Sequence, residues 1–239
     1  MIVELPAFDP LAAMARFTLA GVRPLTMLAL LPAFGGAVLP WRARLAMAAA
    51  LSVFSAFGPQ APPLTLAMLP GEIMAGLLAG LALALAFAAA QMAGEVVAQM
   101  MGLGFASFAG AGGSVSVIGG LFSLLMWCAF LSNDGFAWLF AQGVAGQGLL
   151  APGEIGLARA AIFGGMMFSG ALRIALPLVA LLLLGNLLVA VATRSAPQMG
   201  AMSVGPAALL VGFLWALPLL FEALLARTLV TLDAAQGLL

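Results

Sequence analysis

Histidine and lysine are absent from this 239-residue sequence, and Cys128 is its single cysteine. Without histidine the chain lacks the commonest metal ligand and general base, which excludes a Ser-His-Asp triad and a metalloprotease helix. One cysteine cannot form a disulfide within the chain, and Cys128 lies in an apolar run where a buried thiol is expected. We therefore expect no enzyme activity, no metal and no cofactor.

Charge is also scarce. Charged residues make up 7% of the sequence and hydrophobic residues 65%, and the mean hydropathy is +1.23. Soluble domains have roughly 25% charged and under 50% apolar residues. The composition predicts an integral membrane protein with several spans, and its zero net charge gives no reason to expect a nucleic acid partner. Residues 1–10 lack the basic region of a secretory signal peptide, so the first hydrophobic segment is expected to stay.

The hydrophobic residues predict an all-α fold of about six long helices in hairpins, broken by proline and glycine. The segments lie near 10–35, 42–57, 64–101, 116–141 with a polar break at 132–135, 156–193 and 203–232. The third is overlong, since about 30 residues extend about 45 Å against a membrane core of about 30 Å. The positive-inside rule places Arg42, Arg44 and Arg194 in the cytoplasm and both termini outside.

Two short patterns in the third segment concern helix packing and helix starts. Gly76 and Gly80 form a GxxxG pattern, which is typical of closely packed helices. The tripeptide Pro-Gly-Glu occurs at residues 70–72 and again at 152–154, each time before a long apolar helix. We interpret both as helix starts, where an acidic side chain interacts favourably with the helix dipole.

The stretch 91–120 is the most distinctive part of the chain. Gln91, Glu95 and Gln99 are four residues apart and share one face of a helix. A glycine-rich, uncharged run then follows, which predicts a flexible loop kept out of bulk water. A phosphate-binding loop is excluded, because the run has no Gly-Lys-Ser/Thr and lacks the complete dinucleotide-binding glycine pattern.

Glu95, Asp134, Arg173 and Glu222 are ionisable residues inside hydrophobic segments, where charge is a hint of function. Three roles are open for them: contacts between helices or subunits, the polar lining of a pore, and a proton relay. The glutamines one turn from Glu95 favour assembly. A small multi-span solute transporter is the alternative function, suggested by Glu95, Asp134 and Arg173 and by proline-broken helices.

Residues 94–108, 133–135 and 176–199 resemble the FliR family of flagellar export-gate proteins, and virulence type III secretion proteins share the pattern. Upstream, Arg23, Pro32, Pro40, Arg42 and Arg44 also fall as in the family's first hairpin. The similarity extends over nearly the whole chain. The sequence departs from the family at residues 109–113, which read AGAGG where Asp-Pro is common, and after Asn133, where the usual Asn-Gly-His is absent.

The resemblance implies a subunit of the gate through which unfolded flagellar proteins leave the cytoplasm. Such a chain lies in the bacterial inner membrane, at the flagellar basal body, in a hetero-oligomer with FliP-like and FliQ-like subunits and further export-apparatus proteins. Residues 1–150 correspond to a FliP-like four-helix part, and residues 151–239 to a FliQ-like helical hairpin. An injectisome subunit is the alternative within the family.

The resemblance also implies a plug, in which the loop 102–118 enters the pore. The residues expected in the plug or at its root are Met100, Met101, Gly102, Leu103, Gly104, Phe105, Phe108, Gly110, Gly112 and Gly113. The polar residues expected to lie within the membrane or to support assembly are Gln91, Glu95, Gln99, Asp134, Arg173, Asn186, Arg194 and Glu222.

Overall fold

Seven α-helices and one short β-hairpin make up the part of the chain that the structure describes. The structure, a computed structural model, describes residues 10–31, 40–57, 66–104, 107–110, 113–144, 157–195 and 201–236. In chain order the elements are α1 (Pro10–Ala29), α2 (Trp41–Phe57), the 3-10 turn η1 (Leu66–Met68), α3 (Leu69–Met100), β1 (Ser107–Gly110), β2 (Gly113–Ser116), α4 (Val117–Ser132), α5 (Gly135–Val144), α6 (Leu157–Ser195) and α7 (Ala201–Gln236). The predicted helical fold is confirmed, and its six segments correspond to seven helices because one segment contains both α4 and α5.

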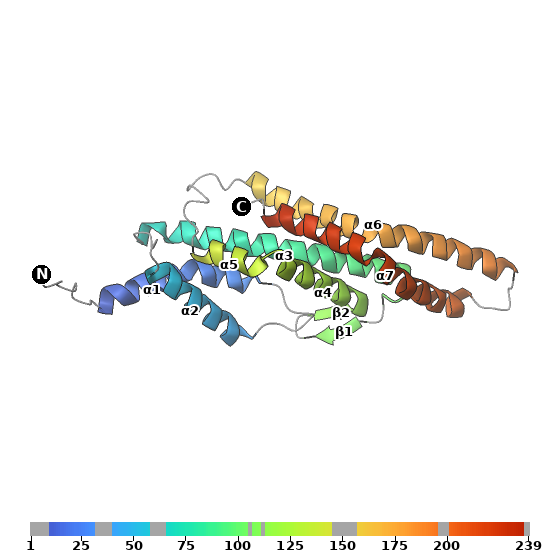
Figure 1. Cartoon of the computed structure of the whole chain (residues 1–239), viewed down its shortest axis with the longest axis horizontal. Coiled ribbons are helices and arrows are strands. Elements are labelled where there is room, and N and C mark those ends of the chain that lie inside the picture. Colours follow the sequence, from blue (N-terminus) through green and yellow to red (C-terminus); the bar gives the residue numbers. More distant parts are fainter. Residues whose placement is uncertain are drawn as a thin grey trace, which may run out of the picture.

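Helix α3 is the element on which the others pack. Its 32 residues extend about 48 Å at 1.5 Å per residue, as the overlong segment predicts. In Figure 1 it runs through the middle of the molecule, and it contacts α1, α4, α6 and α7. Alanine lines much of its buried surface, and Ala89, Ala93 and Ala98 are fully buried. Small side chains of this kind allow neighbouring helices to approach closely.

Two glycines of α3 lie directly against the backbone of α1. A Cβ atom at Gly76 would overlap the carbonyl group of Arg23, and one at Gly80 would lie 2.6 Å from the carbonyl oxygen of Met27. The GxxxG pattern therefore marks a real close contact, which brings the first helix onto α3.

Aromatic rings fill the space where α3, α4 and α5 meet. Phe87 of α3 packs edge-on against Trp127 of α4, with ring centroids 4.7 Å apart. Phe130 lies 5.6 Å from Trp127 and 5.9 Å from Phe136 of α5, again edge-on. Edge-to-face pairs contribute about 0.5–1.5 kcal/mol beyond the burial of their area. Besides Phe122 of α4, the largest side chains that are fully buried elsewhere among the described residues are aliphatic or methionine: Met27, Leu28, Leu83, Met101, Met126, Ile174, Leu178, Leu182, Leu224 and Leu232.

Helices α4 and α5 meet at a bend of 71°. Asn133 caps the end of α4, and Asp134 has a φ of 50°, a left-handed conformation that asparagine and aspartate tolerate better than most residues. Gly135 follows with no room for a side chain, because a Cβ there would lie 2.5 Å from the ring of Phe130. The polar break predicted at residues 132–135 is confirmed.

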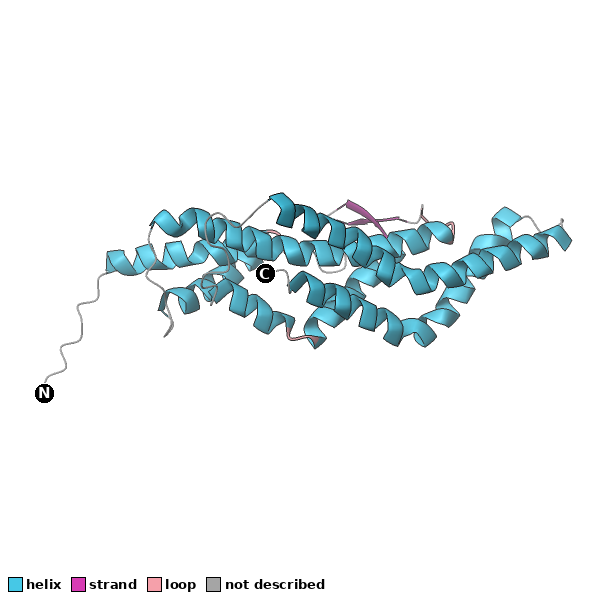
Figure 2. Ribbon diagram, turned by 90° about the horizontal axis from the view of Figure 1, so that it is seen from above, coloured by secondary structure: helices cyan, strands magenta, loops and turns pink. Residues whose placement is uncertain are grey.

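The last two helices form a long hairpin beside α3. Helix α6 has 39 residues and contains Pro177, and α7 has 36 residues and contains Pro206 and Pro218. Each proline removes a backbone hydrogen bond from its helix. In Figures 1 and 2 the connected ends of α6 and α7 extend beyond the other helices.

Three helical stretches are long and apolar enough to cross a membrane, namely Leu66–Met100, Gly164–Ser195 and Gly205–Gln236. The bent α4–α5 pair makes a fourth if it counts as one span. Among the described residues α1 and α2, which carry two arginines each, do not reach this threshold. The fold is that of an α-helical membrane protein, and the predicted placement of both termini outside stays a prediction.

The glycine-rich segment differs in part from the predicted loop. Strands β1 and β2 pair antiparallel, with Ser107 opposite Ser116 and Gly110 opposite Gly113. Figure 2 shows this hairpin at the edge of the helical body. Two residues separate the strands, and a two-residue connection that contains glycine is what a tight hairpin needs. The glycines that exclude a helix here thus permit a chain reversal, which the sequence analysis did not predict.

Candidate functional site

The 102–118 segment begins at Gly102, the residue that terminates helix α3. Gly102 has a φ of +72°, and its amide donates to the carbonyl of Gln99 at 3.0 Å. The amide of Leu103 donates to the carbonyl of Ala98 at 2.9 Å. This pair of bonds is a Schellman motif, which ends helices with a residue in the left-handed conformation, usually glycine. The first root of the predicted plug is therefore a defined helix end.

Both helices of the C-terminal hairpin contact this helix end. The side-chain amide of Asn186 in α6 donates to the carbonyl of Met100 at 3.3 Å. The ring of Pro206 in α7 lies 3.4 Å from the position of a Cβ at Gly102. Met101 is fully buried and Leu103 packs partly buried on the core. The structure thus brings together Asn186 and the predicted plug root, which are far apart in sequence.

The C-terminal end of the segment, its second root at Ser116, is bonded to α3 through Glu95. The Oε1 atom of Glu95 accepts the backbone amide of Ser116 at 2.8 Å. Ser116 is also the N-cap of α4, and its Oγ accepts the amide of Gly119 at 2.9 Å, a bond that satisfies one of the free amides of the first turn. A Cβ at Gly94 would lie 2.6 Å from the Cα of Gly119, so the two helices touch backbone to backbone here.

Between these roots, the structure describes the hairpin by its backbone. Gly110 and Gly113 are the last paired positions before the connection, and Phe108 lies within β1 opposite Val115. Phe105 and Gly112, which were also predicted for the plug, lie outside the described residues. Gly104 precedes the strands at an exposed position.

The three polar residues of α3 do not share a partner. Glu95 and Gln91 are half-buried, whereas Gln99 is exposed. Only for Glu95 does the described part of the chain give a side-chain hydrogen bond. This bond lies within the chain, so the structure supports a positioning role for Glu95 here and leaves its predicted contact with other subunits a prediction.

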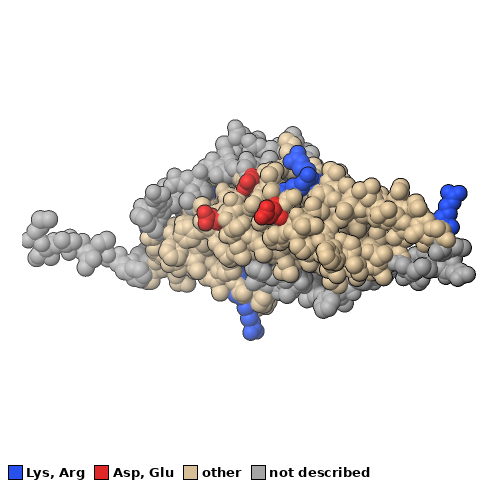
Figure 3. Space-filling view, turned by 45° about the vertical axis from the view of Figure 1, so that its right-hand side comes forward, with Lys and Arg blue, Asp and Glu red and all other residues tan. Residues whose placement is uncertain are grey.

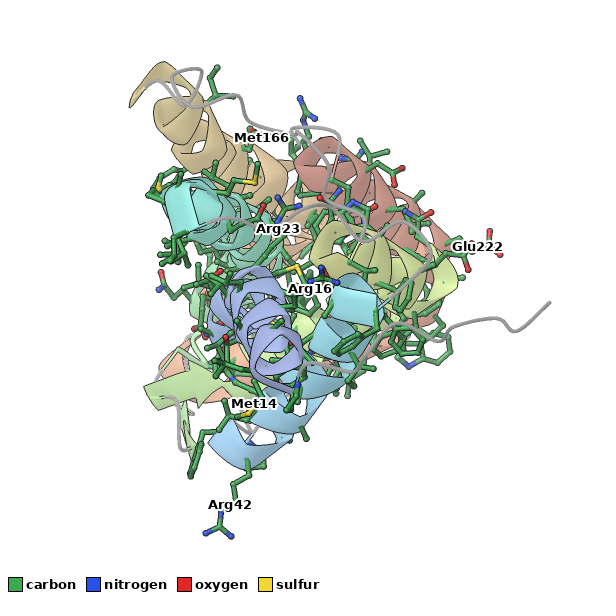
Figure 4. The ribbon with its side chains drawn as sticks, turned by 90° about the vertical axis from the view of Figure 1, so that its left-hand side faces the viewer. Met14, Arg16, Arg23, Arg42, Met166 and Glu222 are labelled. Atoms are coloured by element: carbon green, nitrogen blue, oxygen red, sulfur yellow. The ribbon has the colours of Figure 1, made fainter. Side chains whose placement is uncertain are left out.

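The remaining predicted polar residues are distributed over the surface. Asp134, Arg173, Arg194 and Glu222 are exposed, and Figure 4 shows Glu222 pointing away from the helices. The backbone carbonyl of Arg173 accepts a hydrogen bond from Arg227 at 2.7 Å. Figure 3 shows on one face how few charged side chains interrupt the uncharged surface. Within the described ranges these four residues lie apart, and no group of three or more acidic or cysteine side chains that could hold a metal ion is found there. The expected burial of Cys128 is wrong, because its side chain is exposed.

Sequence reasoning missed an ion pair between α1 and α3. The guanidinium of Arg23 contacts both carboxylate oxygens of Glu72, with Nε to Oε2 at 2.6 Å and Nη2 to Oε1 at 3.0 Å. The Arg23 side chain is 10% exposed and that of Glu72 is 23% exposed. Figure 4 places Arg23 among the helices, whereas Arg42 points outward. Glu72 lies in the first turn of α3, as predicted. Its pairing with Arg23 was not predicted, and the one hint in the sequence was that Arg23 stands in an apolar helix.

Two further polar contacts at helix ends were not predicted from the sequence. Arg44, predicted as a cytoplasmic charge, donates to backbone carbonyls at the end of α1, including those of Leu28 at 3.2 Å and Leu31 at 3.1 Å. A cation at a helix C-terminus is favoured by the helix dipole. At the α4–α5 bend, Asn133 donates to Asp233 of α7 at 2.6 Å.

An apolar groove runs between α6 and α7 near their connected ends. Its volume is about 580 Å³. Gly212 leaves the groove open, since a Cβ there would meet nothing within 4 Å, and Trp215 beside it is 77% exposed. The residues lining the groove are Leu181, Leu182, Leu184, Gly185, Leu188, Val189, Ala208, Leu209, Gly212, Trp215, Ala216 and Leu219.

Comparison with known proteins gives one family and two similar flagellar proteins. A family model described as "Bacterial export proteins, family 1" matches residues 14–233. The "Flagellar biosynthetic protein FliR" of Pectobacterium carotovorum subsp. carotovorum is 30% identical over 154 residues, which cover 60% of this chain and 58% of that protein. The protein of the same name from Escherichia coli (strain K12) is 29% identical over 152 residues, or 59% of this chain and 57% of that protein. The aligned part therefore spans less than two-thirds of either relative. Because the family model matches almost the entire sequence, the chain belongs to the bacterial export proteins, family 1.

Proposed function

We propose that this chain is a structural subunit of the flagellar protein export gate and that it helps to form and seal the pore through which unfolded flagellar proteins leave the cytoplasm. The observation that carries the proposal is the match of residues 14–233 to the bacterial export family. The two relatives reported above are named flagellar biosynthetic proteins, which favours a flagellar over an injectisome machine. The proposed place of action is the bacterial inner membrane at the flagellar basal body.

The proposed partners are a FliP-like and a FliQ-like membrane subunit, together with further export-apparatus proteins. Residues 1–150 take the place of a FliP-like subunit and residues 151–239 that of a FliQ-like hairpin. The arrangement of α6 and α7 as two successive long helices supports this division. Many large apolar side chains on these two helices are exposed, such as Leu184, Leu188 and Leu219. In a membrane assembly such surfaces are available to partner helices.

The proposed seal is the 102–118 segment. It starts at the Schellman motif of Gly102 and ends at the Glu95–Ser116 bond, so both ends are fixed while the strands between them lie at the edge of the helical body. An uncharged hairpin of small residues with a phenylalanine can fill a narrow pore without leaving buried charge. The role is structural, so it assigns no catalytic residue and no cofactor.

Co-purification tests the assembly. The chain is co-expressed with the two other small hydrophobic export subunits of its own genome, purified through a tag on this chain in mild detergent, and the mass of the complex is measured. We expect a stable hetero-oligomer that contains both subunits. A lone chain or a homodimer would contradict the proposal and favour the solute transporter.

Deletions in the hairpin test the seal. Removal of residues 110–113 shortens the hairpin between its roots, and we expect the assembled complex to leak small ions and to export less selectively. A deletion of equal length at 146–149, in the longer connection between α5 and α6, is the control for effects of shortening a connection. Normal sealing and normal export by the 110–113 deletion would contradict the seal.

A further inference from the structure

One side chain fastens the β-hairpin to the helical body at its second root. Glu95 Oε1 accepts the Ser116 amide at 2.8 Å. In the register of the hairpin Ser116 pairs with Ser107, at the end away from the tip, so the bond is made where the hairpin joins α4. We propose that the Glu95–Ser116 bond is a latch that holds the hairpin of residues 107–116 against α3 and sets how readily it opens. The proposal rests on the proposed function, in which this hairpin seals the pore.

The chemistry of the bond suits a latch. A backbone amide bonded to a carboxylate forms a charge-assisted hydrogen bond, which is roughly twice as strong as a neutral one. Glu95 is half-buried and its partner Ser116 is buried, so the bond is partly shielded from water, which strengthens it further. Its loss is expected to raise the open population of the hairpin about tenfold or more.

The position of the bond also suits a latch. The first root at Gly102 is held by backbone bonds of the helix end and by contacts from α6 and α7. The second root has a bond from a long side chain, which can release its partner by a rotamer change without unfolding either helix. Gly94 beside Glu95 keeps α4 close enough for this bond, because α4 meets α3 there without side chains between the backbones.

Both partners of the bond can be removed separately, each with a matched control. Glu95→Ala removes the acceptor, whereas Glu95→Gln keeps an oxygen that can accept the same amide. Ser116 has φ −64° and ψ 152°, which proline adopts, so Ser116→Pro removes the amide donor, together with the Oγ that caps α4, and leaves the backbone conformation unchanged. Ser116→Ala loses only the Oγ bond to Gly119 and keeps the donor.

Hydrogen exchange of the amides in residues 107–116, measured in the purified complex, reports the opening directly. We expect Glu95→Ala and Ser116→Pro to raise the exchange rate about tenfold or more, and Ser116→Ala to change it less than about threefold. Glu95→Gln is expected to raise the rate by less than Glu95→Ala, because a neutral amide oxygen keeps a weaker bond to the same donor. The double variant of Glu95→Ala and Ser116→Pro is expected to exchange no faster than Ser116→Pro alone, because Ser116→Pro already removes the bond that Glu95→Ala removes.

The outcomes separate the latch from the seal. An unchanged exchange rate in Glu95→Ala or in Ser116→Pro overturns the latch. Equal exchange rates in Ser116→Pro and Ser116→Ala also overturn it, because the effect would then come from loss of the Oγ cap. If Glu95→Ala fails to assemble, the two Ser116 variants decide. Ion leakage through the assembled complex is then measured for the same variants. Faster exchange with more leakage supports both ideas, whereas faster exchange with normal leakage leaves the latch and overturns the proposed seal.

Discussion

At the scale of single residues, the ion pair of Arg23 and Glu72 joins α1 to α3. The guanidinium contacts both carboxylate oxygens, and little of either side chain is exposed. Two-point contacts of this kind give geometric specificity as well as energy. The pair therefore fixes the position of α1 along α3, next to the glycines at 76 and 80.

Replacing Glu72 with glutamine is expected to lower the free energy of unfolding by about 2 kcal/mol, because the buried guanidinium of Arg23 loses its counter-charge. Thermal unfolding in detergent measures the effect, and Glu222→Gln, at an exposed position, is the control. The double replacement of Arg23 and Glu72 by methionine is expected to recover part of the loss, since no charge then remains buried. Equal shifts for Glu72→Gln and Glu222→Gln would show that the pair does not stabilise the fold.

Gly94 carries the second prediction at this scale. A Cβ at this position meets the backbone of Gly119 rather than a flexible side chain, so Gly94→Ala must push α3 and α4 apart. We expect a loss of about 1–3 kcal/mol in the free energy of unfolding. Gly120→Ala is the matched control, because a Cβ there meets nothing within 4 Å, and it is expected to be neutral or to stabilise α4 by up to about 1 kcal/mol. Similar stability of both variants would contradict the close contact.

At the scale of elements, the sequence predicts helices well because their signals are local. Long apolar segments give α3, α6 and α7 within a few residues, and Asn133 with Gly135 marks the α4–α5 break. The hairpin was missed although two glycine-flanked runs of five residues, 105–109 and 114–118, were visible, because glycine weakens strands as well as helices. The Arg23–Glu72 and Glu95–Ser116 contacts could not be predicted, since they join residues 49 and 21 positions apart and depend on how the helices pack.

The end of α3 gives a prediction for an element. Gly102→Ala places a Cβ on a residue with φ +72°, which costs an L-amino acid about 1–2 kcal/mol. We expect this variant to unfold at a lower temperature and its amides near residues 99–103 to exchange faster. Gly71→Ala, at the other end of the same helix and with nothing within 4 Å, is the control. Unchanged exchange near residues 99–103 would mean that the Schellman motif does not hold the plug root.

At the scale of the whole molecule, the chain is well packed around α3 and poorly covered at the α6–α7 end. In the candidate spans of α6 and α7, 22% of the residues in the apolar window are buried within the chain. The corresponding share is 56% for the span that contains α3. Helices with so little cover within the chain are expected either to face lipid or to meet other subunits. The apolar groove between them makes the second possibility testable, because it offers a concave surface that a partner helix can enter.

Filling the groove should therefore weaken assembly and leave the chain itself intact. The Cβ of Gly212→Leu meets nothing within 4 Å, so we expect the leucine to occupy the groove without displacing α6 or α7. Gly165→Leu is the control, because it adds the same side chain at an open position outside the groove, in α6 instead of α7. We expect co-purification of the partner subunits to fall at least several-fold for Gly212→Leu alone, with equal thermal unfolding of both uncomplexed variants. Equal recovery of partners by both variants would show that lipid, and no partner helix, occupies the groove.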